Sequence, residues 1–221
     1  MIRPPERLPD RDAAIDAMLV HVPFDGWSLR ALRHGLADIE QPVDDAELLF
    51  PGGAADMVAA FCDLADRRME QAAVEAGIGE LRLSQRVRAV IVLRLEAGHG
   101  HKEAVRRAVA ILALPGRARI AAACTARTVD AIWHASGDDS SDMSWYTKRA
   151  ILTGVYAVTL MFWLRDSSED NSATWDFLDR RLAGVAKIGK FRRGTTKRIT
   201  RFLPSPLSGK FNEARPASEI T

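Results

Sequence analysis

The side chains in this 221-residue chain that could carry out chemistry do not form a recognisable catalytic set. His99 and His101 lie two residues apart between glycines, a spacing that could hold a metal ion, but no third ligand accompanies them. Asp138, Asp139 and Asp142 resemble a paired-carboxylate site, although a helix-capping loop explains them more simply. The chain also lacks P-loop, HExxH and CxxC motifs. We therefore expect a protein that is not an enzyme and that has no metal site.

A second group of side chains is aromatic and cationic. The stretch IWHASGDDSSDMSWYTKRAI, residues 132–151, places Trp, Tyr, Lys and Arg behind a polar loop. An uncharged run follows over residues 150–164. Trp, Tyr and Arg are the side chains that most often dominate binding energy at protein interfaces. The stretch therefore indicates a binding surface, and internal packing of the two aromatic side chains is the alternative.

The elements that position these residues are predicted to be helices. Apolar residues recur three and four positions apart, and long alternating runs are absent. Ser28 and Asp142 are candidate N-caps, while Pro115-Gly116 and Gly137 are candidate breaks. The sequence thus predicts an all-α bundle, with helices over about 10–20, 28–40, 44–50, 54–76, 84–97, 101–114, 117–136, 142–165 and 171–188.

The helix expected over residues 142–165 is apolar all round. One face carries Trp145, Arg149, Leu152, Tyr156, Leu160 and Trp163, and the opposite face carries Ile151, Gly154, Val158 and Met161. A helix of this kind is usually buried on all sides, which predicts a central core helix. The alternative is that one side lines a cavity for an apolar ligand.

Residues 28–60 are predicted to form a helix, a turn, a helix and then a longer helix. That layout is like the DNA-binding head of a tetracycline-repressor-type regulator. These residues hold two basic and six acidic side chains, a net charge of −4, which repels DNA phosphates. We expect a head with the shape of the regulator's head but without its electrostatics, and an ordinary helical subdomain is the alternative.

The C-terminal part of the chain is strongly basic. Eight basic and no acidic residues lie over 181–203, and the charges over 204–221 cancel. Because the net charge of the whole chain is +2, residues 1–180 have a net charge of −6. Over 188–203 an apolar face with Ile188, Phe191, Ile199 and Phe202 lies opposite a basic face with Lys190, Arg193, Lys197 and Arg201. The pattern predicts an amphipathic helix on an anionic membrane surface, with docking on the chain's own body or a flexible basic arm as alternatives. Residues 204–221 are predicted to be disordered.

The remaining composition points to a reducing environment and to no membrane crossing. Cys62 and Cys124 both fall in helical patterns, where buried, reduced thiols are expected. The N-terminus shows no secretory apolar segment. The longest uncharged run, over 150–164, is shorter than the roughly 20 residues that span a bilayer.

Several motifs resemble the accessory lipid-binding family of coenzyme Q (ubiquinone) biosynthesis. They are GWSLRAL at 26–32, LFPGG at 49–53, LALPG at 112–116, IWHASGDDSSDMSWYTKRAIL at 132–152, DSSED at 166–170 and TWDFLDRRL at 174–182. The resemblance covers most of the chain. It implies a tetracycline-repressor-like all-α fold, a homodimer, and a protein that neither represses transcription nor catalyses a reaction.

The resemblance also implies a function and a set of site residues. The family binds isoprenoid quinone lipids in a hydrophobic cavity, associates with membranes through a C-terminal amphipathic helix and binds the di-iron demethoxyubiquinone hydroxylase. The family's partner surface falls on Ile132, Trp133, Asp142, Trp145, Tyr146 and Arg149, and the candidate lipid-lining residues are Leu152, Tyr156, Leu160 and Trp163. No cofactor besides the lipid and no nucleic acid is expected. A ligand-responsive transcriptional regulator is the competing hypothesis.

The sequence therefore predicts four regions. They are a head over 1–60, a lipid-binding bundle over 61–187, a membrane helix over 188–203 and a disordered tail over 204–221. The expected location is peripheral, on the cytoplasmic face of a bacterial inner membrane or the matrix side of a mitochondrial one.

Overall fold

The computed structural model describes residues 5–137 and 144–185, and within the second range it describes side chains from residue 146 onward. The chain divides into two units, residues 1–183 and 184–221. The first unit is the one described below. Every regular element in its described ranges is a helix and none is a strand, which confirms the predicted all-α class.

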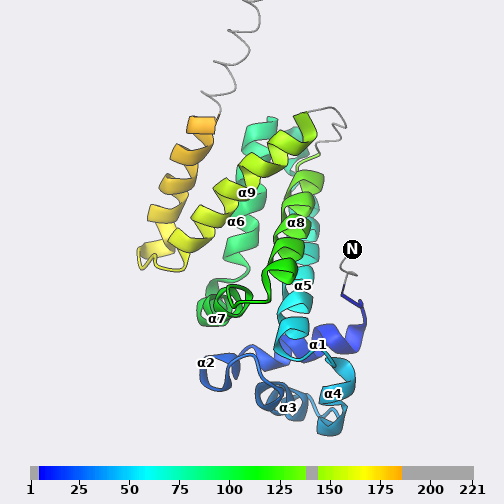
Figure 1. Ribbon diagram of the computed structural model, residues 1–221. Coiled ribbons are helices and arrows are strands. Elements are labelled where there is room, and N and C mark those ends of the chain that lie inside the picture. Colours follow the sequence, from blue (N-terminus) through cyan, green and yellow to red (C-terminus); the bar gives the residue numbers. More distant parts are fainter. Residues whose placement is uncertain (1–4, 138–143, 186–221) are drawn as a thin grey trace, which may run out of the picture. The chain divides into compact units, whose positions relative to one another are not determined.

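The head comprises the helices before residue 50, which lie at one end of the first unit (Figure 1). They are α1 (Pro9–Met18), α2 (Val22–Asp25), α3 (Leu29–Asp38), a 3₁₀ turn (Val43–Asp45) and α4 (Ala46–Leu49). The next helix, α5 (Ala54–Glu75), runs from the head into the bundle without a break. The boundary predicted at residue 60 therefore falls inside a continuous helix.

The bundle is formed by α5 and the helices that follow it. They are α6 (Leu83–Glu96), α7 (Lys102–Leu112), α8 (Ala118–Ala135), α9 (Ser144–Trp163) and a helix described over residues 172–185; short 3₁₀ turns lie at Ile78–Glu80, His99–His101 and Glu169–Asn171. Gly77 and Gly137, at φ +60° and +66°, end α5 and α8 in the left-handed conformation that glycine adopts without strain. The predicted break at Gly137 is confirmed because α8 ends there. The predicted break at Pro115-Gly116 is confirmed because these residues lie between the end of α7 at Leu112 and the start of α8 at Ala118.

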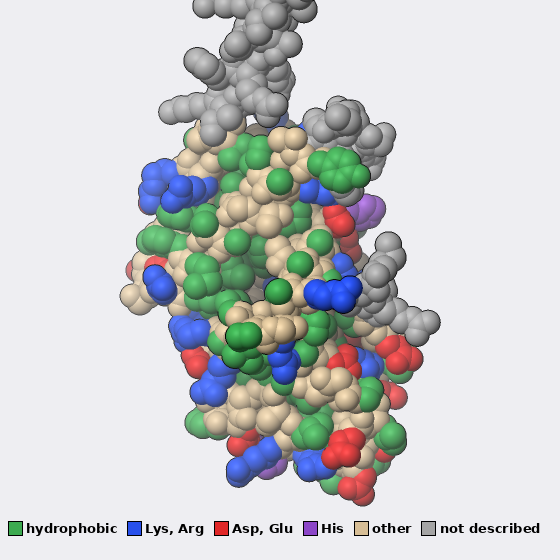
Figure 2. Space-filling view, in the orientation of Figure 1, with side chains coloured by type: hydrophobic (Ala, Val, Ile, Leu, Met, Phe, Trp, Pro, Cys, Tyr) green, Lys and Arg blue, Asp and Glu red, His purple; other side chains and the backbone are tan. Residues whose placement is uncertain are grey.

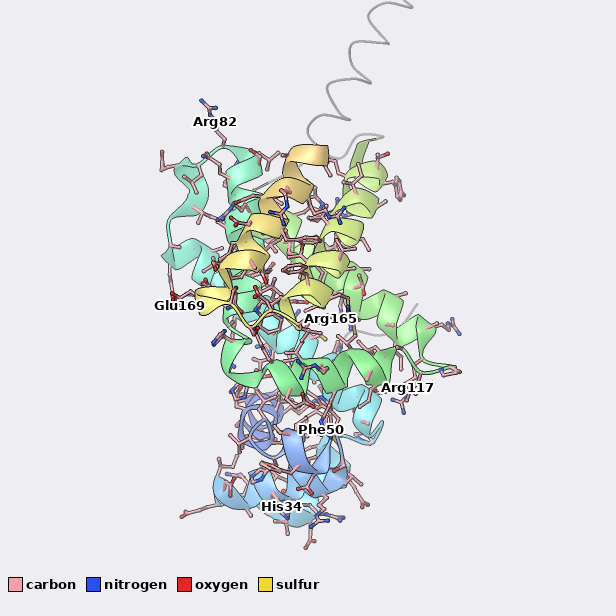
Figure 3. All side chains as sticks on the ribbon, turned by 90° about the vertical axis from the view of Figure 1, so that its left-hand side faces the viewer. His34, Phe50, Arg82, Arg117, Arg165 and Glu169 are labelled. Atoms are coloured by element: carbon pink, nitrogen blue, oxygen red, sulfur yellow. The ribbon has the colours of Figure 1, made fainter. Side chains whose placement is uncertain are left out.

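Close contacts hold the head together and attach it to the bundle. The Ser28 hydroxyl caps α3 by accepting from the Ala31 N–H at 3.2 Å, as predicted. A Cβ at Gly35 would lie 2.5 Å from the backbone nitrogen of Met18, so only glycine lets α3 approach α1 this closely. The indole of Trp27 donates to the Ala104 carbonyl of α7 at 3.0 Å. In Figure 3, Phe50 lies on the side of the head toward the bundle and His34 on the far side.

The structure corrects one prediction about α9. Leu152, Tyr156 and Trp163 are buried, as expected for a core helix. Ile151, Val158 and Met161 on the opposite face are instead 38–43% exposed. The prediction of burial on all sides was wrong because the described helices that pack on α9, which are α6, α8 and the helix that carries Phe177, leave this face uncovered. Figure 2 shows hydrophobic side chains gathered over the bundle in this view, whereas acidic and basic side chains intermingle over the head.

Among the described residues, no single helix has both the length and the apolar composition needed to cross a membrane. One bent pair, residues 43–49 with 54–75 at an angle of 82°, meets those two criteria when its halves are taken together.

Candidate functional site

A cavity of about 80 Å³ lies between α5, α6, α7, α8 and α9. Most of its wall is apolar, with Phe61 from α5, Leu95 from α6, Val105 and Ala108 from α7, and Leu160 and Trp163 from α9. Gly98 allows the Trp163 ring to close one side, since a Cβ there would lie 3.3 Å from the indole. A cavity of this composition suits an apolar ligand.

Three of the four residues expected to line a lipid cavity meet at this wall. Tyr156, Leu160 and Trp163 line the cavity, since they lie on the buried face of α9. Leu152 is buried at 3% exposure but is not part of the wall. The lipid-binding role of these residues stays a prediction.

The volume limits what the cavity holds as it stands. An apolar cavity that accommodates benzene measures about 150 Å³, and the cavity here measures about 80 Å³. A polyprenyl chain therefore requires the surrounding helices to move apart.

One part of the wall is polar and was not anticipated from the sequence. Arg94 on α6 lines the cavity, and its Nε donates to Asp66 Oδ1 on α5 at 2.8 Å. The Thr128 hydroxyl on α8 donates to Asp66 Oδ2 at 2.8 Å. Burial raises the pKa of Asp66, and the bonds from Arg94 and Thr128 oppose that shift. The signal available in the sequence was a charged residue at a buried position of each helix.

Two thiols also line the cavity. Cys62 and Cys124 are both free and both contribute to the wall; Cys124 is buried, as predicted, whereas Cys62 is half-buried. Hydrogen bonding to Cys62 lowers the pKa of Cys124 to about 7, while the same bond, together with burial, raises the pKa of Cys62. An Arg127 Nη donor lies 3.3 Å from the Cys124 sulfur and favours its thiolate.

Of the residues predicted to form the partner surface, one aromatic residue is exposed and two residues are buried. Tyr146 is 74% exposed, as a surface residue should be. Ile132 and Trp133 are 0% and 9% exposed, so they pack inside the first unit and offer no surface themselves. They are buried because they lie on the face of α8 that packs into the bundle.

Of the other members of that surface, Arg149 is described and is half-buried. Arg149 forms an ion pair with Asp130 on α8. Asp142 and the Trp145 side chain lie outside the described residues.

Two further predicted sites are the membrane helix and the histidine pair. The eight residues of the predicted membrane helix, from Ile188 to Phe202, lie outside the described part of the chain. His99 Nδ1 lies 3.0 Å from the Asn171 side-chain nitrogen. Within the described ranges, no three His, Cys, Asp or Glu side chains are grouped so that they could hold a metal ion.

The two arginines within residues 28–60 lie close to carboxylates. Arg33 lies 3.0 Å from Glu47, and Arg30 lies 3.3 Å from Asp25. His34 also contacts Asp25, at 3.0 Å. Both arginines within residues 28–60 therefore have a carboxylate partner inside the head.

Comparisons with known proteins agree with this fold and with the sequence motifs. Residues 118–189 match the family model COQ9. "Ubiquinone biosynthesis protein COQ9, mitochondrial" of Xenopus tropicalis is 32% identical over 79% of this chain and 57% of its own length. The Drosophila melanogaster protein of the same name is 33% identical over 93% of this chain and 64% of its own.

A solved structure provides the fold comparison. The TetR transcriptional regulator from Nitrosomonas europaea superposes with a TM-score of 0.65 at 27% identity, covering 81% of this chain and 99% of that one. The chain spans only 57% and 64% of the length of the two curated relatives named above. The family-model match over residues 118–189 and the similarity to these two relatives show that most of this chain is similar to COQ9 proteins.

Proposed function

We propose that this chain is an accessory protein of ubiquinone biosynthesis that binds isoprenoid quinone intermediates between α5 and α9 and presents them to a hydroxylase. The observation that carries the proposal is the apolar cavity, with Leu160 and Trp163 in its wall. The names of the relatives support the pathway. The protein itself makes and breaks no bond in this scheme.

The energetics of a prenyl tail favour such a role. Each buried CH₂ contributes about 0.8 kcal/mol, so a long tail resists leaving a bilayer for water. An apolar cavity beside the membrane removes most of that barrier. The cavity enlarges when α9 moves outward, because the far face of α9, with Val158 and Met161, is not covered by described residues.

Filling the cavity tests lipid binding. Ala108, 3% exposed on α7, lines the cavity, so Ala108→Leu places three further carbon atoms there. We expect the wild-type protein to yield isoprenoid quinones on organic extraction and mass spectrometry after incubation with quinone-containing vesicles. The variant should yield at least tenfold less.

The control makes the same change on the surface. Ala157→Leu on the exposed face of α9 should retain the wild-type amount of lipid. A wild-type protein that takes up no isoprenoid would remove the proposed function. Equal loading of both variants would move the lipid to another site.

The second half of the proposal concerns the hydroxylase. Tyr146, at the start of α9, is the exposed aromatic residue of the predicted partner surface. Tyr146→Ala should weaken capture of the purified di-iron hydroxylase by about tenfold, since an interface anchor contributes about 1–2 kcal/mol or more. Phe24→Ala, which removes an 85% exposed aromatic ring from the head, should leave capture unchanged. Equal capture by both variants would place the hydroxylase elsewhere.

The membrane-binding residues over 188–203 remain part of the proposal. A basic amphipathic helix there would hold the chain on an anionic surface. The corresponding location is the cytoplasmic face of a bacterial inner membrane or the matrix side of a mitochondrial one. The second candidate function is transcriptional regulation, which the structural similarity to the regulator from Nitrosomonas europaea suggests. The ion pairs of Arg30 and Arg33 argue against DNA binding by the head.

A further inference from the structure

Two residues at the cavity wall carry hydrogen-bond donor groups that have no acceptor among the described residues. Arg94 and Tyr156 are each 7% exposed and both line the cavity. Arg94 uses Nε on Asp66, and its terminal nitrogens reach no acceptor among the described residues. The Tyr156 hydroxyl likewise donates to no described residue. The indole N–H of Trp163, also in this wall, is buried without an acceptor among the described residues, which costs about 1–3 kcal/mol. This wall is therefore suited to an occupant that carries oxygen.

The surrounding contacts fix the direction in which Arg94 faces. Asp66 lines a separate polar cleft of about 250 Å³ on the other side, together with Arg67 and His134. Arg94 lines the apolar cavity and not that cleft. The Asp66–Arg94 pair thus forms a partition, and Thr128 holds the carboxylate from a third helix. A guanidinium held at Nε on one side keeps its terminal N–H groups available on the other.

The charge at this wall selects among head groups. Arg94 and Asp66 together are neutral, so a carboxylate or phosphate buried there would gain no net counter-charge against its desolvation. A neutral carbonyl or ring oxygen has a far smaller desolvation cost and still accepts hydrogen bonds. Burial raises the pKa of Tyr156 to about 12, so its hydroxyl remains a donor throughout the physiological range.

We propose that Arg94 and Tyr156 form a head-group site, which donates hydrogen bonds to the oxygen of a neutral head such as a quinone ring. The apolar tail of that ligand leaves past Leu160 and Trp163. The inference rests on the proposed function and adds to it the residues that determine specificity. A quinone ring is larger than benzene, so the cavity of about 80 Å³ must widen to admit the head, as it must for the tail.

Three probes of similar length test the site. They are a benzoquinone with one isoprenoid unit, an oxygen-free isoprenoid hydrocarbon and an isoprenoid carboxylic acid. Binding is followed by calorimetry on the full chain. We expect the quinone to bind at least tenfold more tightly than either of the others, because it alone uses both donors without burying a charge.

The two tyrosines of the chain supply the variant and its control. Tyr156→Phe keeps the ring and removes one hydrogen bond, so affinity for the quinone should fall about fivefold while affinity for the hydrocarbon stays unchanged. Tyr146→Phe makes the same change on an exposed residue outside the cavity and should alter neither affinity.

The outcomes separate the two proposals. Equal affinity of the wild-type protein for quinone and hydrocarbon, or tightest binding of the acid, overturns the head-group site and leaves lipid binding intact. An unchanged quinone affinity in Tyr156→Phe overturns the role of that hydroxyl. If no probe binds, the proposed function fails as well. The comparison among probes uses the wild-type chain, so it remains decisive even if the variant folds poorly.

Discussion

The head and the bundle use arginine in different ways. In the head, Arg30 and Arg33 lie at the surface with side chains 76% and 47% exposed, and each faces a carboxylate. In the bundle, the Arg94 side chain is 8% exposed, meets Asp66 through one nitrogen and faces a cavity with the others. A regulator would need free cations in the head. The comparison therefore favours the bundle as the region that binds a ligand.

The largest expected effect distinguishes the two kinds of ion pair. Arg94→Leu leaves Asp66 buried without its cation, which should lower the free energy of unfolding by about 3–5 kcal/mol. Arg33→Leu removes an exposed pair in the head and should lower it by less than about 1 kcal/mol. Urea unfolding of both variants measures the difference.

A double variant serves as the control for this prediction. Arg94→Leu combined with Asp66→Leu removes both charges and should recover much of the loss, since no unpaired charge stays buried. If Arg94→Leu proves no more costly than Arg33→Leu, the partition between the cavity and the polar cleft is not the rigid element described here.

Periodicity predicted the longer helices because apolar residues at three- and four-residue spacing identify a buried face. It missed α2, since the four residues Val22–Asp25 are too short to show a period. It also misjudged α9, whose two faces are both apolar. Where composition does not distinguish the faces, the neighbouring helices decide which one is buried.

The candidate site was predictable to a similar extent. Tyr156, Leu160 and Trp163 share a helical face, so one helix suffices to group them. Asp66 and Arg94 are 28 residues apart on different helices, and Thr128 lies on a third. Their meeting depends on how α5, α6 and α8 pack, which spacing along the chain does not encode.

A smaller effect is expected when the charge of the head is reversed. Asp44→Lys, Asp45→Lys and Glu47→Lys together change the net charge of residues 28–60 from −4 to +2. The wild-type chain should not bind duplex DNA at low salt. The triple variant should bind it at least tenfold more tightly, with log K falling by about 0.9 per phosphate contact for each unit of log salt concentration. A fluorescence titration at several salt concentrations measures both quantities.

The matched control for the head makes the same charge change elsewhere. Glu75→Lys, Glu80→Lys and Glu96→Lys alter exposed residues of the bundle by the same total charge. Equal DNA binding by the two triple variants would mean that net charge, and not the shape of the head, governs the interaction. Sequence-specific binding by the wild-type chain would restore the regulator hypothesis.

The smallest expected effect concerns how helix starts are capped in the two regions. Ser28 in the head caps α3 with one hydrogen bond. In the bundle, Asp166 accepts hydrogen bonds from the backbone N–H and hydroxyl groups of both Ser168 and Thr174, at the start of the last described helix. Although burial opposes the shift, these bonds lower the pKa of Asp166 to about 2.

The pH dependence of stability follows from that lowered pKa. The Asp166 contribution should be complete above about pH 4, the ordinary carboxyl pKa, and should be lost as the pH falls through about 2. Asp166→Asn should therefore lower the free energy of unfolding by about 1 kcal/mol at neutral pH, the usual size of a cap. The difference from wild type should shrink between pH 4 and pH 2. Asp176→Asn, on an exposed face of the same helix, should show no such dependence, and a constant deficit in Asp166→Asn would indicate that packing, not the charge, holds this turn.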